Sequence, residues 1–263
     1  MPLELPAEDT LEFLHSESDQ AVDDLNLLTS SGGVILGQAK HTLSLEISET
    51  SDLASSLDQF VRQFHNAREQ LAGTLPQGRE LDPAKDRLVI ITSSNSSSAI
   101  RKDLSDLLTR LRLLVPHKKG VALNTAGSNA SEQKALSVVR THVERSWQVR
   151  TGSAPSEAEV GSLLELIHVL VLDVDPEGRD EREARTILRQ SILKNPDQAD
   201  VVWKSWIENQ ALLARTKAGL NRQQFQQLLI RDGIALLAAR SFQDDINRLI
   251  DHAKDTASPC LPV

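Results

Sequence analysis

The chain has 263 residues, of which 40% are hydrophobic, 25% are charged and 3% are aromatic, and its formal net charge is −8. No apolar run approaches the length of about 18 residues that spans a bilayer, and no charged-then-apolar leader opens the chain, so membrane insertion and secretion are not expected. The single cysteine, Cys260, excludes an internal disulfide and suits a reducing cytoplasm. The acidic balance opposes non-specific nucleic-acid binding, and the absence of tyrosine disfavours base stacking on single strands.

The first forty residues predict strands joined by turns. Apolar runs typical of strands occur at 11–14, 21–25 and 34–41. Ser30-Ser31-Gly32-Gly33 separates the last two and is a turn sequence. We therefore expect a hairpin formed by 21–25 and 34–41.

This hairpin would bring together residues that can perform metal-dependent chemistry. Side chains alternate along a strand, so Gln38 and Lys40 are expected to point the same way while Ala39 faces opposite. Asp23 or Asp24 on the neighbouring strand can then face them within reach of one cation. Mg²⁺ prefers oxygen ligands in octahedral geometry, and a lysine beside it can neutralise charge on a phosphate.

Helices and buried strands alternate in the next part of the chain. Helical spacing of apolar residues predicts a helix over 51–74, with Ser51 or Thr50 as its N-cap. A continuous apolar run at 87–92 predicts a buried strand, and a further helix is expected at about 98–115. This alternation favours an α/β protein with a mixed sheet.

From about residue 130 the pattern becomes mainly helical. A helix is expected up to about Val149, and 167–172 is the only convincing strand of this half. Ser153-Ala154-Pro155-Ser156 is a linker that ends in an N-cap. Further helices are expected at about 181–194, 198–218, 222–231 and 234–254.

Val22-Asp23-Asp24-Leu25 and Gln38-Ala39-Lys40 together resemble the PD-(D/E)xK restriction-endonuclease superfamily, most closely its Mrr-like branch. The resemblance implies that Asp23, Gln38 and Lys40 are catalytic: Asp23 holds the metal, Gln38 replaces the second acidic residue, and Lys40 is the catalytic lysine. Asp24 is the ligand if the register shifts by one residue. Glu17, the nearest upstream carboxylate, is an additional candidate ligand.

The resemblance also implies a fold and a function. Residues 1–128 would form a restriction-endonuclease-like mixed sheet flanked by helices, without the family's first helix, and residues 129–263 a mainly helical regulatory or interaction domain. The expected activity is Mg²⁺-dependent cleavage of double-stranded DNA, with Mn²⁺ as a substitute, by a cytoplasmic effector of bacterial anti-phage defence. Expected partners are a regulatory protein or a C-terminal sensor or NTPase domain, and a second copy of the chain.

The sequence leaves three alternatives open. The basic residues Arg101, Lys102, Lys118 and Lys119 are candidates for contacts to the DNA backbone, or else belong to a solvated helix face and a basic loop. The rival to an active nuclease is a catalytically inactive nuclease-fold module that mediates interactions in a defence or NTPase complex. RNA cleavage by the same site is a third hypothesis.

Overall fold

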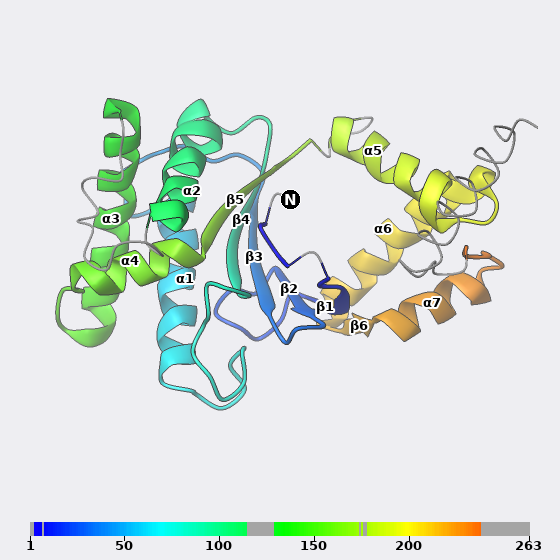
Figure 1. The fold of residues 1–263 in the computed structure, drawn as a ribbon, viewed down its shortest axis with the longest axis horizontal. Coiled ribbons are helices and arrows are strands. Elements are labelled where there is room, and N and C mark those ends of the chain that lie inside the picture. The colour runs from blue at the N-terminus through cyan, green and yellow to red at the C-terminus, as the bar shows by residue number, and fades with distance from the viewer. Residues whose placement is uncertain (1–2, 7, 115–128, 174, 176–177, 238–263) are drawn as a thin grey trace, which may run out of the picture.

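The chain is an α/β protein built on a six-stranded mixed sheet (Figure 1). A computed structural model describes residues 3–6, 8–114, 129–173, 175 and 178–237. The sheet order is β5-β4-β3-β2-β1-β6. β1, β2 and β3 form an antiparallel meander, β4 and β5 run parallel to β3, and β6 is antiparallel to β1. The strands are β1 (Leu11–Ser16), β2 (Leu25–Thr29), β3 (Val34–Lys40), β4 (Arg87–Ser93), β5 (Ile167–Leu172) and β6 (Gly219–Asn221).

One face of the sheet is covered by helices that form the main hydrophobic core (Figure 1). These helices are α1 (Asp52–Arg68), the π-helical η1 (Ala99–Leu104), α2 (Ser105–Leu114), α3 (Ala130–Thr151) and α4 (Glu157–Leu166). Apolar residues from all of them meet Leu36, Leu88 and Ile90 of the central strands. The core therefore continues across position 128, because β5 pairs with β4 and α3 packs against α1.

Side-chain caps mark the start of three helices of this body. Ser51 caps α1 by accepting from Ala54 N at 3.1 Å, and Asn129 and Ser156 cap α3 and α4. α1 ends at Arg68, before the predicted 74. The helix predicted over 98–115 is present as η1 followed by α2. The predicted strands at 87–92 and 167–172 are confirmed as β4 and β5.

A second, smaller group of helices lies on the other side of the sheet (Figure 1). Its own core contains five buried residues of the described chain: Leu193, Ala199, Val202, Leu229 and Ile234. The elements are α5 (Arg179–Ile187), η4 (Leu188–Ile192), η5 (Pro196–Gln198), α6 (Ala199–Thr216) and α7 (Arg222–Arg231). Most of the helix predicted over 234–254 falls outside the described residues, and its first residues are not helical, since Leu236 bridges to Leu193.

The short strand β6 attaches this group to the sheet, and the sequence did not predict it. Leu220 pairs with Leu14, and Gly219 pairs with His15. A side chain at Gly219 would place its Cβ 2.0 Å from the ring of Phe13, so only glycine permits this approach. Three residues are too few to produce a recognisable strand pattern, so only the pairing with β1 defines them.

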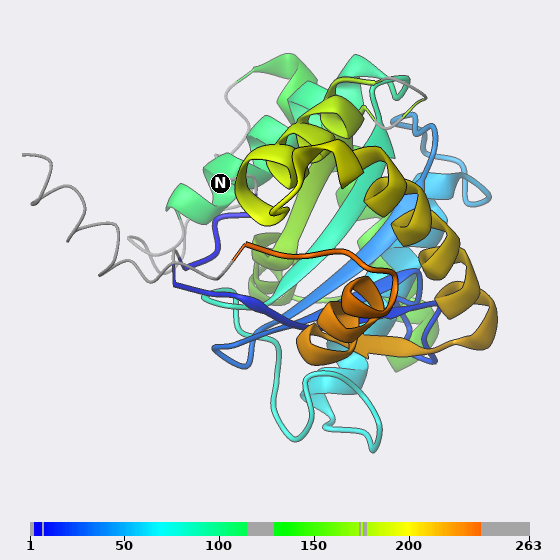
Figure 2. The same ribbon diagram turned by 90° about the vertical axis from the view of Figure 1, so that its right-hand side faces the viewer.

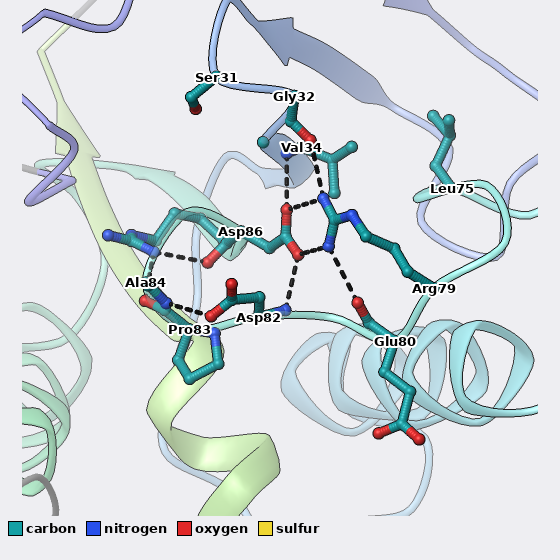
Figure 3. A network of polar contacts seen from close by, with 12 residues as sticks. Ser31, Gly32, Val34, Leu75, Arg79, Glu80, Asp82, Pro83, Ala84 and Asp86 are labelled. Carbon is teal, nitrogen blue, oxygen red and sulfur yellow. Dashed lines mark hydrogen bonds and ion pairs between the residues drawn. The ribbon is translucent and has the colours of Figure 1, made fainter.

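A buried ion pair holds β3 and β4 together at their first residues (Figure 3). Asp86 is fully buried and accepts from Val34 N at 2.9 Å, which ties the start of β3 to the residue before β4. The Arg79 guanidinium donates to both oxygens of that carboxylate and to the Gly32 carbonyl. This network fixes the alignment of β3 with β4 and therefore the positions of Gln38 and Lys40 relative to the rest of the sheet.

Among the helices of the described residues, none combines the length and the hydropathy that a membrane span requires.

Candidate active site

The two adjacent aspartates lie at the end of the turn that joins β1 to β2. Backbone N–H groups of Glu17 and Ser18 donate to the carbonyls of Asp24 and Asp23 at 3.2 and 2.9 Å, and these bonds close the turn. β2 begins at the next residue, Leu25. The strand predicted for this stretch exists only at its last residue, because the preceding backbone bonds within the turn instead of joining the sheet.

Helix α1 holds this turn in place through Gln63, which is fully buried. Its side-chain oxygen accepts from Ala21 N at 3.1 Å, and its amide nitrogen donates to Leu75 O at 2.6 Å and to the Gln20 side chain at 3.3 Å. A buried amide with both of its atoms hydrogen-bonded is a rigid support. The aspartates are therefore held against α1 as well as against β1.

Gln38 and Lys40 project from the last part of β3, as the strand alternation predicts. Gln38 is 3% exposed and Lys40 is half-buried, whereas Ala39 between them is exposed. Their parallel partners on β4 are Ile90 for Gln38 and Thr92 for Lys40. The ladder with β2 ends at Gly37, so pairing with β4 alone sets the backbone at Gln38 and Lys40.

The structure brings Asp24 into direct contact with the Gln-x-Lys segment. Its Oδ2 accepts from Gln38 Nε2 at 2.5 Å and from Ala39 N at 2.7 Å. The charge of Lys40 also acts on this carboxylate. A carboxylate, a buried amide and a lysine therefore meet where β2 begins and β3 ends.

The electrostatics of this pair of aspartates favour a positive partner. Burial raises the pKa of Asp24 above its ordinary value, and the charge of Asp23 raises the pKa further. The Ala39 N–H and the charge of Lys40 act in the opposite direction. Two neighbouring carboxylates, one of them with a raised pKa, are typical of functional sites.

Gln59 of α1 belongs to the same site, although no sequence pattern predicted it. Its Nε2 lies 3.4 Å from Asp23 Oδ1. The Oε1 atoms of Gln59 and Gln38 are both buried and have no hydrogen-bond partner among the described residues. Along the sequence, Gln59 is one polar residue in an amphipathic helix, and only the packing of α1 on the sheet directs it toward Asp23.

Glu17, the additional candidate ligand, lies at the opposite end of the turn. Its side chain is exposed and its backbone has a left-handed φ of 53°. Its N–H bonds to the carbonyl of Asp24, which places the two residues side by side in the backbone.

Two of the four candidate DNA-binding residues lie in the part of the chain that the structure describes. Arg101 and Lys102 are exposed on η1, and Arg101 Nε donates to Ser96 O at 2.7 Å. Lys118 and Lys119 lie outside the described residues.

Two neighbouring arginines of α2 make internal contacts. Arg110 pairs with Glu132 at 3.0 Å, while Arg112 bonds to Ile167 O at 2.8 Å and pairs with Glu4 at 3.1 Å. These two side chains therefore fasten α2 to neighbouring elements.

The oxygen atoms near Gln38 are the candidate metal ligands. Across the described ranges, no cluster of three or more His, Cys, Asp or Glu side chains could hold a metal ion. A site here would instead combine the carboxylates of Asp23 and Asp24 with amide oxygens of Gln38 and Gln59. All of these are hard oxygen donors, the type that Mg²⁺ and Mn²⁺ prefer.

Comparison with known proteins gives no assignment, since no family model, no curated protein and no solved structure matches the chain.

Proposed function

We propose that the chain is a metal-dependent endonuclease that cleaves double-stranded DNA through a PD-(D/E)xK-like site. The observation that carries this proposal is the contact of Asp24 with Gln38 and Ala39, beside Lys40. A partly buried carboxylate, an amide and a lysine meet at adjoining strand ends, and together these groups suit hydrolysis of a phosphodiester.

The order of the elements supports a restriction-endonuclease-like fold. The antiparallel meander β1-β2-β3 is followed by α1 and then by β4, parallel to β3. The aspartates precede β2 and the Gln-x-Lys segment ends β3. This is the sequence order in which the resemblance places its metal ligand and its lysine.

The donor set fits a hard divalent cation. Asp23 and Asp24 supply carboxylates, and the buried Oε1 of Gln38 is an oxygen without a partner among the described residues. Burial and then the charge of Asp23 raise the pKa of Asp24, and a bound cation would compensate both effects. When bound, Mg²⁺ or Mn²⁺ would supply Lewis acidity at the scissile phosphate.

Each protein group then has a defined task. Asp24 and Asp23 hold the cation, and the Gln38 amide keeps the Asp24 carboxylate in one orientation. Lys40 neutralises the negative charge that develops on the phosphate oxygens during attack by water. Pairing of Lys40 with Thr92 of β4 holds the backbone that carries the ammonium group in place.

The remaining parts of the proposal concern the setting of the enzyme. Arg101 and Lys102 would contact the DNA backbone, with Lys118 and Lys119 as further candidates. We place the enzyme in the cytoplasm as a regulated effector of anti-phage defence. The helices after β5 would dock a regulatory protein or a sensor or NTPase domain, and a second copy of the chain would allow both DNA strands to be cut.

A catalytically inactive interaction module is the second candidate, and a specific observation favours it. Asp24 Oδ2 already accepts two hydrogen bonds, so this oxygen is satisfied without a cation. The net charge of −8 also works against DNA binding. In this case the same residues would only stabilise the sheet, and the chain would act as a scaffold in a defence or NTPase complex.

Plasmid cleavage tests the proposal directly. The purified chain is incubated with supercoiled plasmid in Mg²⁺, in Mn²⁺ and in EDTA, beside Lys40→Ala, Asp23→Asn and Asp24→Asn. Lys134→Ala, an exposed lysine on α3, is the matched control. We expect metal-dependent nicking or linearisation by the wild type and by Lys134→Ala, and none by Lys40→Ala. Equal cleavage by the wild type and by Lys40→Ala would overturn the assignment.

Thermal unfolding separates the nuclease from the scaffold. A cation that binds the folded site raises the melting temperature by mass action. We expect Mg²⁺ or Mn²⁺ to stabilise the wild type, with the shift lost in whichever of Asp23→Asn and Asp24→Asn removes the ligand. A melting temperature that is insensitive to metal in all three proteins, together with no cleavage, would overturn the metal site and favour the scaffold.

A further inference from the structure

The end of helix α6 lies against the turn that carries the aspartates. The ring nitrogen Nε2 of His15, on β1, bonds to the Lys217 carbonyl at 2.8 Å. The Ser16 hydroxyl donates to the Gln210 side chain at 3.3 Å. The next element along the chain after α6 is β6, which pairs with β1. Figure 2 shows α6 running along the sheet toward β6, and the two hydrogen bonds place its end against β1, beside the start of the turn.

Lys217 is the residue that this arrangement presents to the site. It ends α6 with a left-handed φ of 48°, and its backbone N–H bonds back to Ala214 O. Its side chain leaves the helix toward the turn, where Nζ lies 2.8 Å from Asp19 Oδ1. Asp19 belongs to the same closed turn as Asp23. The backbone of Lys217 is therefore fixed while its ammonium group reaches the carboxylates.

The charges around Lys217 come from this turn. Its pKa is raised, first by Asp19 and then by the charges of Asp23 and Glu17. The turn holds four carboxylates, Glu17, Asp19, Asp23 and Asp24, which together repel a phosphate backbone. A nuclease with this turn needs cationic side chains beside the turn, because they offset the repulsion of the phosphates. Lys40 supplies one positive charge against these four carboxylates.

Lys217 can readily exchange Asp19 for another anionic partner. The side chains of Lys217 and Asp19 are 61% and 89% exposed. Such surface pairs contribute little, because water solvates both partners and salt screens them. A phosphate, with its own charge and several oxygens, can replace a single solvated carboxylate as the partner of an ammonium group.

We propose that Lys217 is a substrate-binding residue which leaves Asp19 and binds a backbone phosphate of the nucleic acid that lies over Asp23, Asp24 and Lys40. This inference rests on the proposed nuclease function and adds a contact that comes from the C-terminal helices. Those helices would then complete the substrate-binding surface, and displacement of α6 from β1 would withdraw one phosphate contact.

The competing explanation is that the pair only fastens α6 to the sheet. The two explanations differ in what they predict for Asp19. A fastening role makes Lys217 and Asp19 equivalent, because removal of either breaks the same pair. A phosphate-binding role makes them opposite, because Asp19 competes with the substrate for the ammonium group.

Binding to a labelled DNA duplex distinguishes these roles without turnover. Fluorescence anisotropy is measured in EDTA over a range of NaCl concentrations for the full chain, Lys217→Met, Lys217→Arg, Asp19→Asn and Lys134→Ala, with circular dichroism as a check on folding. We expect Lys217→Met to bind several-fold more weakly, with a salt slope smaller by about one unit. Lys217→Arg should retain binding, Asp19→Asn should bind at least as tightly as the wild type, and Lys134→Ala should not differ.

Equal weakening by Lys217→Met and Asp19→Asn would overturn the proposal, as would an unchanged salt slope in Lys217→Met or the absence of duplex binding by the wild type. A wild type that binds duplex but does not cleave plasmid in Mg²⁺ or Mn²⁺ would refute the nuclease alone. The comparison of Lys217 with Asp19 would still be readable in that case, because anisotropy does not depend on cleavage.

Discussion

The sheet with α1 to α4 and the group α5 to α7 bury their apolar residues to different extents. In the first region, the core runs from Val22 to Ile167 and includes residues of every flanking helix. The second has five buried residues in the described chain, while Ile207, Leu212 and Ile230 are each more than half exposed. Burial of apolar surface is the main stabilising contribution, so the first region should be much harder to open.

The polar contacts of the two regions differ in the same way. In the first, the Arg79–Asp86 pair has a fully buried carboxylate that accepts several hydrogen bonds. In the second, Asp200 pairs with Arg185 and Arg189 at the surface. Buried pairs are costly to break, whereas surface pairs contribute little. The proposed catalytic site would need fixed geometry, and Asp24, Gln38 and Lys40 all lie in the first, more extensively buried region. Lys217 comes from the looser one.

The largest effect is expected from Phe60→Ala in the first region. Phe60 is fully buried beneath the sheet, so its truncation leaves a cavity and should lower the free energy of unfolding by about 3–5 kcal/mol. Urea denaturation monitored by circular dichroism measures this loss. A change below about 1 kcal/mol would contradict the picture of a tightly packed body.

A loss of about 3 kcal/mol is expected from Asp86→Ala. The change removes the charged partner of the Arg79 guanidinium and leaves the Val34 N–H without its acceptor. Asp106→Ala, an exposed aspartate on α2, is the control and should be near neutral. Because the network aligns β3, the variant should also lose metal-dependent stabilisation, and a stable variant with unchanged metal response would argue against this coupling.

Leu229→Ala should cost about 2 kcal/mol, and the effect should be local. Leu229 is buried in the small core of α6 and α7. Hydrogen exchange should speed up in α6 and α7 while protection in β3 and β4 is kept. Equal loss of protection in both regions would show that they unfold as one unit and would contradict a separately opening second region.

A pH dependence of at most about 1.4 kcal/mol per pH unit is expected from His168. Burial lowers the pKa of His168 to about 3, with Arg112 and Arg87 acting in the same direction. The unfolded chain binds the proton below about pH 6.5 and the folded chain does not, so stability falls as the pH drops from about 6.5 toward 3. His168→Leu should lose this contribution, and identical pH profiles for both proteins would contradict it.

The sequence predicted much of the first region because its signals are local. Ser51, Asn129 and Ser156 cap the helices that follow them, and Gly32 takes a φ of 75° in the hairpin turn. A continuous apolar run identified β4, since a strand buried on both faces is apolar throughout. In the second region the short strand β6 carries no local signal.

At the candidate site, the sequence itself determined that Gln38 and Lys40 share one side of a strand, because a period of two is a property of the local backbone. Only the tertiary structure decided which aspartate meets them. β2 starts at Leu25 because the preceding turn closes on itself, and this brings Asp24 to Gln38. The approach of Gln59 and Lys217 likewise depends on how α1 and α6 pack on the sheet, a long-range contact that neither residue's neighbours in the chain encode.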